Sequence, residues 1–211
     1  MFHRIATRYL TALAGLALLG TAGCNGTRTL PTDNGSDPKL SAQHQANLSA
    51  IETERTLSNA RYDALLKSWN NRGTGEKPMF AATGSNVNYV ACAPLPFDGS
   101  AQIVGPAGGV FNFGPHKLTV PAGALSASVS IAVMVVSALE TEVKLLPHGT
   151  QFSVPVKLKL AYSHCDSATS HRVAYVDDNG TLLEWTAAVD NPSLGFVEAT
   201  LSHFSIYAVA Y

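Results

Sequence analysis

The chain has 211 residues, which is enough for one ordinary domain with additional segments. Hydrophobic residues make up 46% of the sequence, charged residues make up 14%, and the formal net charge is −1 at pH 7. A chain this close to neutral has no overall positive field to attract nucleic acid, so nucleic acid is not expected among its partners.

Residues 1–23 have the pattern of a secretory signal peptide. Arg4 and Arg8 precede an apolar run at 10–19. This run is too short to cross a bilayer, which needs about 20 residues, and small residues follow it up to Cys24. The pattern therefore predicts export from the cytoplasm.

The tetrapeptide Thr-Ala-Gly-Cys at 21–24 resembles the lipobox of bacterial lipoproteins. The resemblance implies cleavage before Cys24 and a lipid on its sulfur atom. The protein would then be anchored in the cell membrane or the outer membrane, facing the periplasm or the cell surface. The alternative is an ordinary signal peptide that happens to be followed by a cysteine.

Residues 24–37, which follow the predicted cleavage site, are rich in Gly, Thr, Asn, Pro and Ser and predict a flexible tether. Asp37 and Pro38 are a typical helix start, and the sequence then predicts one long helix over 38–72. Its apolar stripe is strongest at 62–69, so we expect this end to dock on the following domain. The alternative is that the helix is a stalk or binds a partner. In either case, the first half of the helix is expected to be solvated or self-associated.

Residues 87–211 are rich in β-branched and aromatic residues and predict an antiparallel β-sandwich, so the fold class is mainly β with one long helix. The candidate strands are 87–92, 101–104, 109–113, 117–120, 129–136, 153–162, 172–176, 182–186, 196–201 and 204–209. Pro155 predicts a late start, a bulge or an edge position for its strand. Asn179-Gly180 predicts a hairpin that places Trp185 opposite Ala174.

Four segments of this region occur in an order that is similar to the ZU-five domain of ankyrins and netrin receptors. They are Gly-Gly-Val at 108–110, Leu-Thr-Val-Pro-Ala-Gly-Ala-Leu at 118–125, Gly-Thr-Gln-Phe-Ser-Val-Pro-Val at 149–156 and His-Phe-Ser-Ile-Tyr at 203–207. The resemblance covers 101–211. It implies a β-sandwich that mediates protein contacts, and in this setting the partner would be another envelope protein.

Cys92 and Cys165 are the two cysteines that remain beside Cys24. Both lie in the exported part, where disulfide bonds persist, so we expect a bond between them. Closing a loop of about 70 residues would stabilise the fold by roughly 3–4 kcal/mol. Two buried thiols, or a reactive cysteine beside His164, are the alternatives.

The tripeptide His203-Phe204-Ser205 resembles the self-cleavage site of ZU-five-type domains in death-domain adaptors. The resemblance implies that the Ser205 hydroxyl attacks the Phe204 carbonyl and that water then hydrolyses the ester. His203 would be the general base or would only shape the strand. The alternative is that the tripeptide begins the last strand, with Phe204 in the core and Ser205 outside.

Other sites have weaker support. The positions His164, Asp166, His171, Asp177, Asp178 and Asp190 lack the spacing of known metal sites, so no metal and no cofactor is expected. Tyr175 and Trp185 are candidates for glycan contacts, and no hydrolase motif appears. We therefore expect a non-enzymatic, membrane-anchored binding or scaffolding module. The alternatives are self-processing at Phe204–Ser205 and an envelope glycan binder or hydrolase.

Overall fold

The computed structural model describes residues 37–72, 87–136, 138–166 and 170–211, which belong to one compact unit. The expected signal peptide, Cys24 and the tether up to Ser36 lie outside the described residues.

The helix α1 spans Pro38–Asn70 and begins where the sequence predicts. Asp37 is the N-cap, and its side chain accepts a hydrogen bond from the backbone N–H of Lys39 at 2.9 Å. Pro38 occupies the first turn, where the missing N–H has no helical partner in any case. The helix ends at Asn71, whose backbone N–H still bonds to Lys67.

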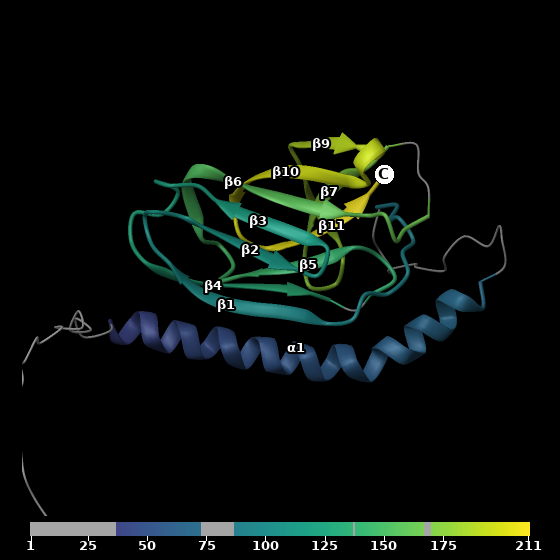
Figure 1. The fold of residues 1–211 in the computed structure, drawn as a ribbon, viewed down its shortest axis with the longest axis horizontal. Helices are drawn as coiled ribbons and strands as arrows, with labels where there is room; N and C mark the ends of the chain where they lie inside the picture. The colour runs from purple at the N-terminus through teal and green to yellow at the C-terminus, as the bar shows by residue number, and fades with distance from the viewer. Residues whose placement is uncertain (1–36, 73–86, 137, 167–169) are drawn as a thin grey trace, which may run out of the picture. The chain divides into compact units, whose positions relative to one another are not determined.

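The strands form two antiparallel sheets, which confirms a mainly β fold (Figure 1). The six-stranded sheet has the order β1-β4-β5-β11-β7-β8, and the five-stranded sheet has the order β2-β3-β6-β10-β9. The bounds are β1 Asp98–Val104, β2 Gly109–Phe113, β3 His116–Val120, β4 Val129–Val135, β5 Glu142–Leu146, β6 Gln151–Ala161, β7 Arg172–Val176, β8 Leu182–Thr186, β9 Ala188–Asn191, β10 Phe196–His203 and β11 Ile206–Ala210. A short 3-10 helix, η1, covers Pro192–Leu194.

The main core lies between the two sheets and consists of the inward side chains of alternating strand positions. Its largest fully buried members are Phe111, Phe113, Leu118, Ile131, Leu145, Leu158, Leu160, Leu201, Phe204 and Tyr207. The alternating residues Ile131, Val133 and Val135 of β4 are part of this core.

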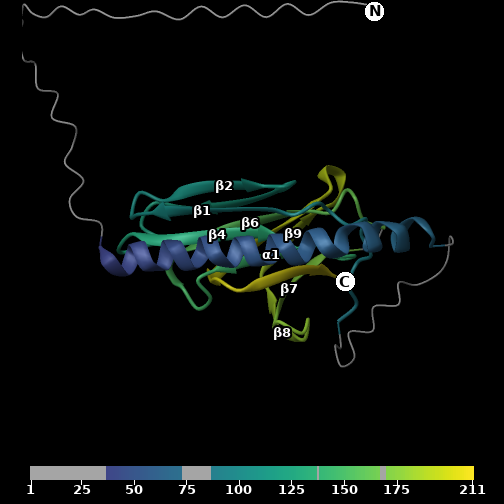
Figure 2. The ribbon, with the colours of Figure 1, turned by 90° about the horizontal axis from the view of Figure 1, so that it is seen from below.

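The outer face of the six-stranded sheet is also covered. Ala132 and Met134 of β4 pack against Ile51 of α1, and α1 runs along β1 and β4 (Figures 1 and 2). Every residue of β11 is buried, because the chain at 87–92 covers part of its outer side. This chain segment is not the strand that the sequence predicts, since it makes only isolated bridges at Tyr89 and Cys92.

The helix docks on the sheet, but not through the part that the sequence predicts. Its buried residues are Asn47, Ile51, Glu54 and Ser58, in the first half and the middle of the helix, whereas the 62–69 stripe is at most half-buried. Three of the four buried side chains are polar, so apolar periodicity could not reveal this face. The expectation of a solvated or self-associated first half is wrong.

Sequence reasoning missed two strands and misassigned the position of Gly180 in one turn. The strands β5 and β9 have only five and four residues, and each carries a charged side chain inside the strand. Pro155 lies in a stretch of β6 where the register with β10 shifts, which confirms the expected irregularity. The hairpin after β7 is confirmed, with Trp185 opposite Ala174. The Gly180 N–H donates to the Asp177 carbonyl and closes a turn whose central residues are 178 and 179. Gly180, with φ +74°, is therefore the last residue of this turn and not one of the central pair.

Candidate functional site

The tripeptide His203-Phe204-Ser205 lies where the chain passes from one sheet to the other. His203 ends β10 in the five-stranded sheet, and β11 begins at Ile206 in the six-stranded sheet. Phe204 is fully buried, and its ring meets Phe152 edge to face at a centroid distance of 4.7 Å. The tripeptide therefore does not begin the last strand but forms the crossing before it.

The carbonyl group of Phe204 is held by a backbone hydrogen bond. Its oxygen accepts from the Gly149 N–H at 3.0 Å, and Nδ1 of His203 lies 3.4 Å from the same oxygen. The Tyr207 hydroxyl donates to the carbonyl of His203 at 2.8 Å and lies 3.5 Å from His203 Nδ1. The Tyr207 hydrogen is directed to that carbonyl, so each of these contacts of His203 is a hydrogen bond only in the tautomer that carries the ring hydrogen on Nδ1.

Ser205 is buried, contrary to the expectation of an outward side chain. Its carbonyl accepts from the Leu145 N–H at 3.0 Å, which fixes the backbone after the candidate bond. Among the described residues, its hydroxyl makes no hydrogen bond, and His203 directs Nδ1 to Phe204 and Tyr207 instead. His203 therefore contacts the carbonyl oxygen of Phe204 and does not contact the Ser205 hydroxyl, which would be the nucleophile.

Cys92 and Cys165 form a disulfide bond, as the sequence predicts. The bond crosses an isolated antiparallel bridge between the 87–92 segment and the loop after β6. Thr141 Oγ1 lies 3.4 Å from each sulfur and 3.4 Å from His164 Nε2. Burial lowers the pKa of His164, so this group is a neutral neighbour of the disulfide.

Cys92, His164 and Cys165 are also close enough together to be considered as metal ligands. Within the described residues, their ligand atoms all lie within 4.8 Å of one another. The two sulfur atoms are bonded to each other, so neither is a thiolate ligand in this state. The cluster fits a structural disulfide and not a metal centre.

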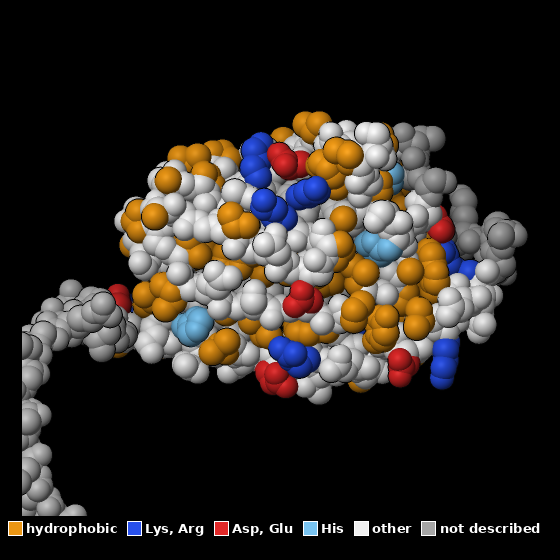
Figure 3. Space-filling view, in the orientation of Figure 1, with side chains coloured by type: hydrophobic (Ala, Val, Ile, Leu, Met, Phe, Trp, Pro, Cys, Tyr) orange, Lys and Arg blue, Asp and Glu red, His pale blue; other side chains and the backbone are white. Residues whose placement is uncertain are grey.

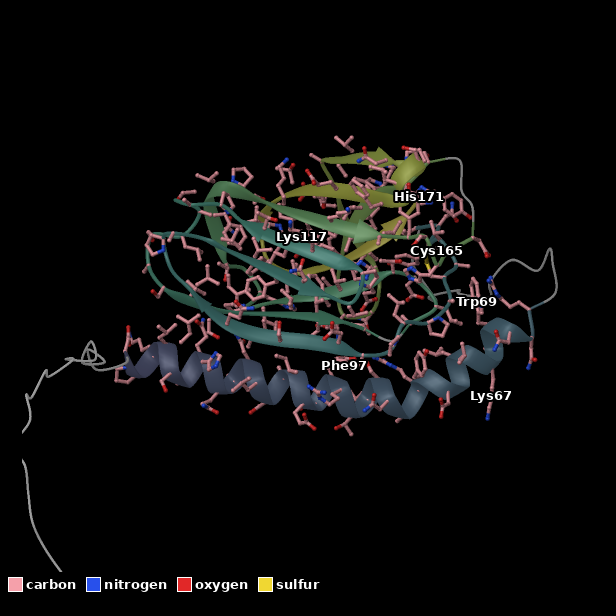
Figure 4. The ribbon with its side chains drawn as sticks, viewed as in Figure 1. Lys67, Trp69, Phe97, Lys117, Cys165 and His171 are labelled. Carbon is pink, nitrogen blue, oxygen red and sulfur yellow. A yellow bond between two sulfur atoms is a disulfide. The ribbon has the colours of Figure 1, made fainter. Side chains whose placement is uncertain are left out.

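A second polar cluster brings together His171 and Asp190, two of the weak candidate metal ligands, with Tyr162, which sequence reasoning did not single out. Asp190 Oδ2 accepts from the backbone N–H of His171 at 2.9 Å and lies 3.2 Å from its ring Nδ1. Tyr162 stacks on the His171 ring at 3.6 Å and donates its hydroxyl to the same carboxylate. Burial opposes ionisation of Asp190, but these hydrogen bonds outweigh it and lower its pKa. Tyr162 directly follows β6, His171 directly precedes β7 and Asp190 lies in β9, so the cluster joins both sheets at one end, where Figure 4 labels His171.

The other candidate metal ligands are not brought together. Asp177 caps its own turn by accepting from the N–H groups of Asn179 and Thr181. Asp166 pairs with Arg72 after α1, with an N···O distance of 3.2 Å. Each aspartate therefore has a local structural role.

Tyr175 and Trp185 do not form a shared glycan surface. Tyr175 lies opposite Glu184 and packs against the core between the sheets, whereas Trp185 lies opposite Ala174 on the other face. The guanidinium of Arg172 covers the Trp185 ring at 3.8 Å from its centroid.

The edge formed by β8, β9 and η1 exposes large aliphatic side chains. β8 is the last strand of one sheet and β9 is the last strand of the other, and one residue separates them in the chain. Leu183 is 53% exposed, Val189 is 66% exposed and Leu194 is 71% exposed. We call the segment 182–194 the aliphatic edge.

No family model matches this chain. No curated protein sequence matches it either. Within the described residues, no helix is both long and apolar enough to cross a membrane.

Proposed function

We propose that the protein is a lipoprotein of the cell envelope that presents its β-domain as a non-enzymatic protein-interaction module. The lipobox-like sequence ending at Cys24 supports the anchor. A lipid with two or three acyl chains on this residue would hold the protein stably at a membrane. The binding role is supported by the surface of the folded domain.

The aliphatic edge is the observation that carries the binding role. Unpaired edge strands offer backbone N–H and C=O groups to another chain, and proteins usually protect such edges. Here Leu183 of β8 and Val189 of β9 are exposed on the two last strands, beside the exposed Glu184 of β8. Exposed apolar patches of this kind mark contacts with other proteins. The partner is another envelope protein that covers this edge.

The anchor is tested by changing Cys24→Ser and fractionating cells after a high-salt wash, which removes protein held only by charge. The unchanged protein should stay with the membrane and incorporate labelled palmitate. The variant should lose the label and leave the membrane fraction. A variant that keeps either property would contradict the proposal.

The binding edge is tested by photo-crosslinking in cells. A photoreactive residue at Leu183 or Val189 should give a discrete adduct with a second protein. The same residue at Ala60 or Ala64, on the exposed side of α1, is the matched control. The proposal fails if all four positions give the same adducts, or if none gives any.

Self-processing at Phe204–Ser205 is the second candidate. It is supported by the Phe204 carbonyl, because the Gly149 N–H donates to the oxygen that would become negative during attack and His203 Nδ1 lies 3.4 Å from the same oxygen. The product 205–211 would contain β11, which pairs with β5 and β7 and would remain in the sheet.

Denatured intact mass separates the two candidates. Self-processing predicts a chain shorter by the residues 205–211, and Ser205→Ala should restore the full mass. A full-length mass of the unchanged protein would leave the binding module as the function.

A further inference from the structure

The outer face of the five-stranded sheet carries a concentrated positive charge. Lys117 of β3 and Lys159 of β6 are directly opposite each other, and Lys157 projects from the same face two residues along β6. We call this outer face, with its three lysines, the lysine face. Figure 3 looks onto this face and shows cationic side chains gathered there, with hydrophobic side chains around them.

The strand register defines this face as two rows of neighbours. One row contains Val110, Thr119, Lys157 and Thr200, and the other contains Asn112, Lys117, Lys159, Glu198 and Val189. Glu198 is the one acidic side chain at an outward position of these strands. The whole chain has a net charge of −1, so positive charge is segregated on the lysine face.

The lysines are not held by ion pairs. Lys157 Nζ donates to Thr200 Oγ1 at 2.7 Å, and Lys159 Nζ lies 3.7 Å from the centroid of the Phe196 ring. None of the three forms a salt bridge with any described residue. Like charges directly opposite on neighbouring strands destabilise a sheet. Glu198 lies opposite Lys159 on its other side and offsets part of this repulsion. Lys117 has only Asn112 and Lys159 as cross-strand neighbours, so positive charge on this face remains available to an anionic partner.

Apolar side chains lie at both margins of the lysine face. Val110 is 47% exposed at the β2 edge, and Val189 is exposed at the β9 edge. Strands about 4.8 Å apart make the face about 19 Å wide from β2 to β9. A wide basic surface with aliphatic margins is suited to a membrane, where lysines meet anionic headgroups and aliphatic side chains enter the headgroup boundary.

We propose that the lysine face binds the anionic headgroups of a lipid bilayer. The inference rests on the proposed lipoprotein function in one respect, because that function is the reason for choosing a membrane as the anionic surface. The residues between Cys24 and Asp37 can span at most about 45 Å, so a lipid on Cys24 would hold the lysine face close to the same bilayer. The face would then set the orientation of the domain. Val189 would lie at the margin that the lysine face shares with the aliphatic edge, and Leu183 and Leu194 of that edge would remain for the protein partner.

The test uses residues 36–211, which form the compact unit and lack Cys24. This protein should co-sediment with vesicles that contain phosphatidylglycerol and not with vesicles of phosphatidylcholine alone. Binding should weaken as salt is raised, because the contacts are with exposed charges. Absence of binding to the anionic vesicles at low salt would overturn the inference.

The specific variant changes Lys117, Lys157 and Lys159 to Gln. Each lysine near an anionic surface is worth about a fivefold change in partitioning, so the triple change should reduce binding on the order of a hundredfold. The matched control removes the same charge from α1 with Lys39→Gln, Arg55→Gln and Lys67→Gln. It should retain binding within a few fold. An equal loss in both variants would mean that only net charge matters and would overturn the inference.

Two further outcomes are distinguishable. Binding to a soluble polyanion such as dextran sulfate, without binding to anionic vesicles, would assign the lysine face to a polymer and overturn the membrane proposal. Because this protein has no lipid anchor, vesicle binding does not depend on Cys24. A protein that is not lipidated in cells but binds anionic vesicles would contradict the proposed anchor and support the lysine face.

Discussion

Asn47 of α1 donates a hydrogen bond from Nδ2 to the backbone carbonyl of Ser130 in β4 at 2.9 Å, and a second to the Ser130 hydroxyl at 3.1 Å. Gln43 completes the contact by accepting from the Ser130 N–H at 3.0 Å. The helix thus bonds the backbone of a strand that it covers. Further along, Glu54 of the helix pairs with Lys144 of β5 at 3.2 Å. The docking of α1 is therefore largely polar, with Ile51 as its buried apolar residue.

The change Asn47→Ala should lower the free energy of unfolding by about 1–3 kcal/mol, because it removes two buried hydrogen bonds and leaves the Ser130 oxygens without this donor. Asn59→Ala, at an exposed position of the same helix, is the control and should change stability by less than about 0.5 kcal/mol. Urea unfolding measures both values. Hydrogen exchange of β4 amides should also become faster in the Asn47 variant alone. Equal effects of the two changes would contradict the proposed role of the polar contact.

Much of the fold could be predicted from the sequence, because alternation and turn residues carry local information. The start of α1 follows from Asp37 and Pro38, and the pairing of Ala174 with Trp185 follows from a hairpin signal. The docking face of α1 could not be predicted, since Asn47 and Glu54 are polar and their partners lie more than eighty residues away. Such partners have no signature in local periodicity.

The candidate sites show the same limit. The disulfide between Cys92 and Cys165 could be predicted because exported cysteines have few other fates. The burial of Ser205 could not, because strand alternation does not describe a chain that passes between sheets. Alternation alone puts Lys157 and Lys159 on one face, because they are two residues apart in a strand. Only the register showed that Lys117 joins them.

Reduction of the disulfide should destabilise residues 36–211 by about 3–4 kcal/mol, because Cys92 and Cys165 close a loop with a sequence separation of 73. The measurement is urea unfolding with and without a phosphine reductant. The variant with both cysteines changed to Ala should already be less stable and should not respond to the reductant. A response of this variant, or none of the unchanged protein, would contradict the prediction.

His116 should make the protein less stable in mild acid. Its Nδ1 accepts from the Ala161 N–H at 3.1 Å, while its buried Nε2 has no hydrogen-bond partner among the described residues. Burial, and then the electrostatic influence of His164 on a protonated ring, lower the pKa of His116 to about 3. The unfolded chain takes up this proton near pH 6.5, so stability is lost as pH falls below that value. The loss is about 2 kcal/mol by pH 5 from this group.

His116→Asn isolates this contribution, since the asparagine oxygen can accept from Ala161 and does not titrate. The variant should be less stable at neutral pH because it leaves a cavity. Its stability should, however, fall by about 2 kcal/mol less than that of the unchanged protein between pH 7 and pH 5. Parallel pH profiles of the two proteins would show that His116 does not remain neutral in the fold.

Glu140 should act in the opposite direction. Burial, and then the charge of Glu142, raise the pKa of Glu140 from 4.5 to about 7. The folded state therefore holds more protons than the unfolded chain between these values, and stability from this group is lost as pH rises through the window. Glu140→Gln should increase the free energy of unfolding by about 1–2 kcal/mol near pH 8. This is less than the full pKa shift would give, because Glu140 is partly exposed to solvent. Near pH 4.5 the change should have little effect. Glu52→Gln, an exposed control on α1, should show no such pH dependence. Unfolding in urea at both pH values decides the matter, because a gain of equal size at each pH would mean that the charge of Glu140 is not the cause.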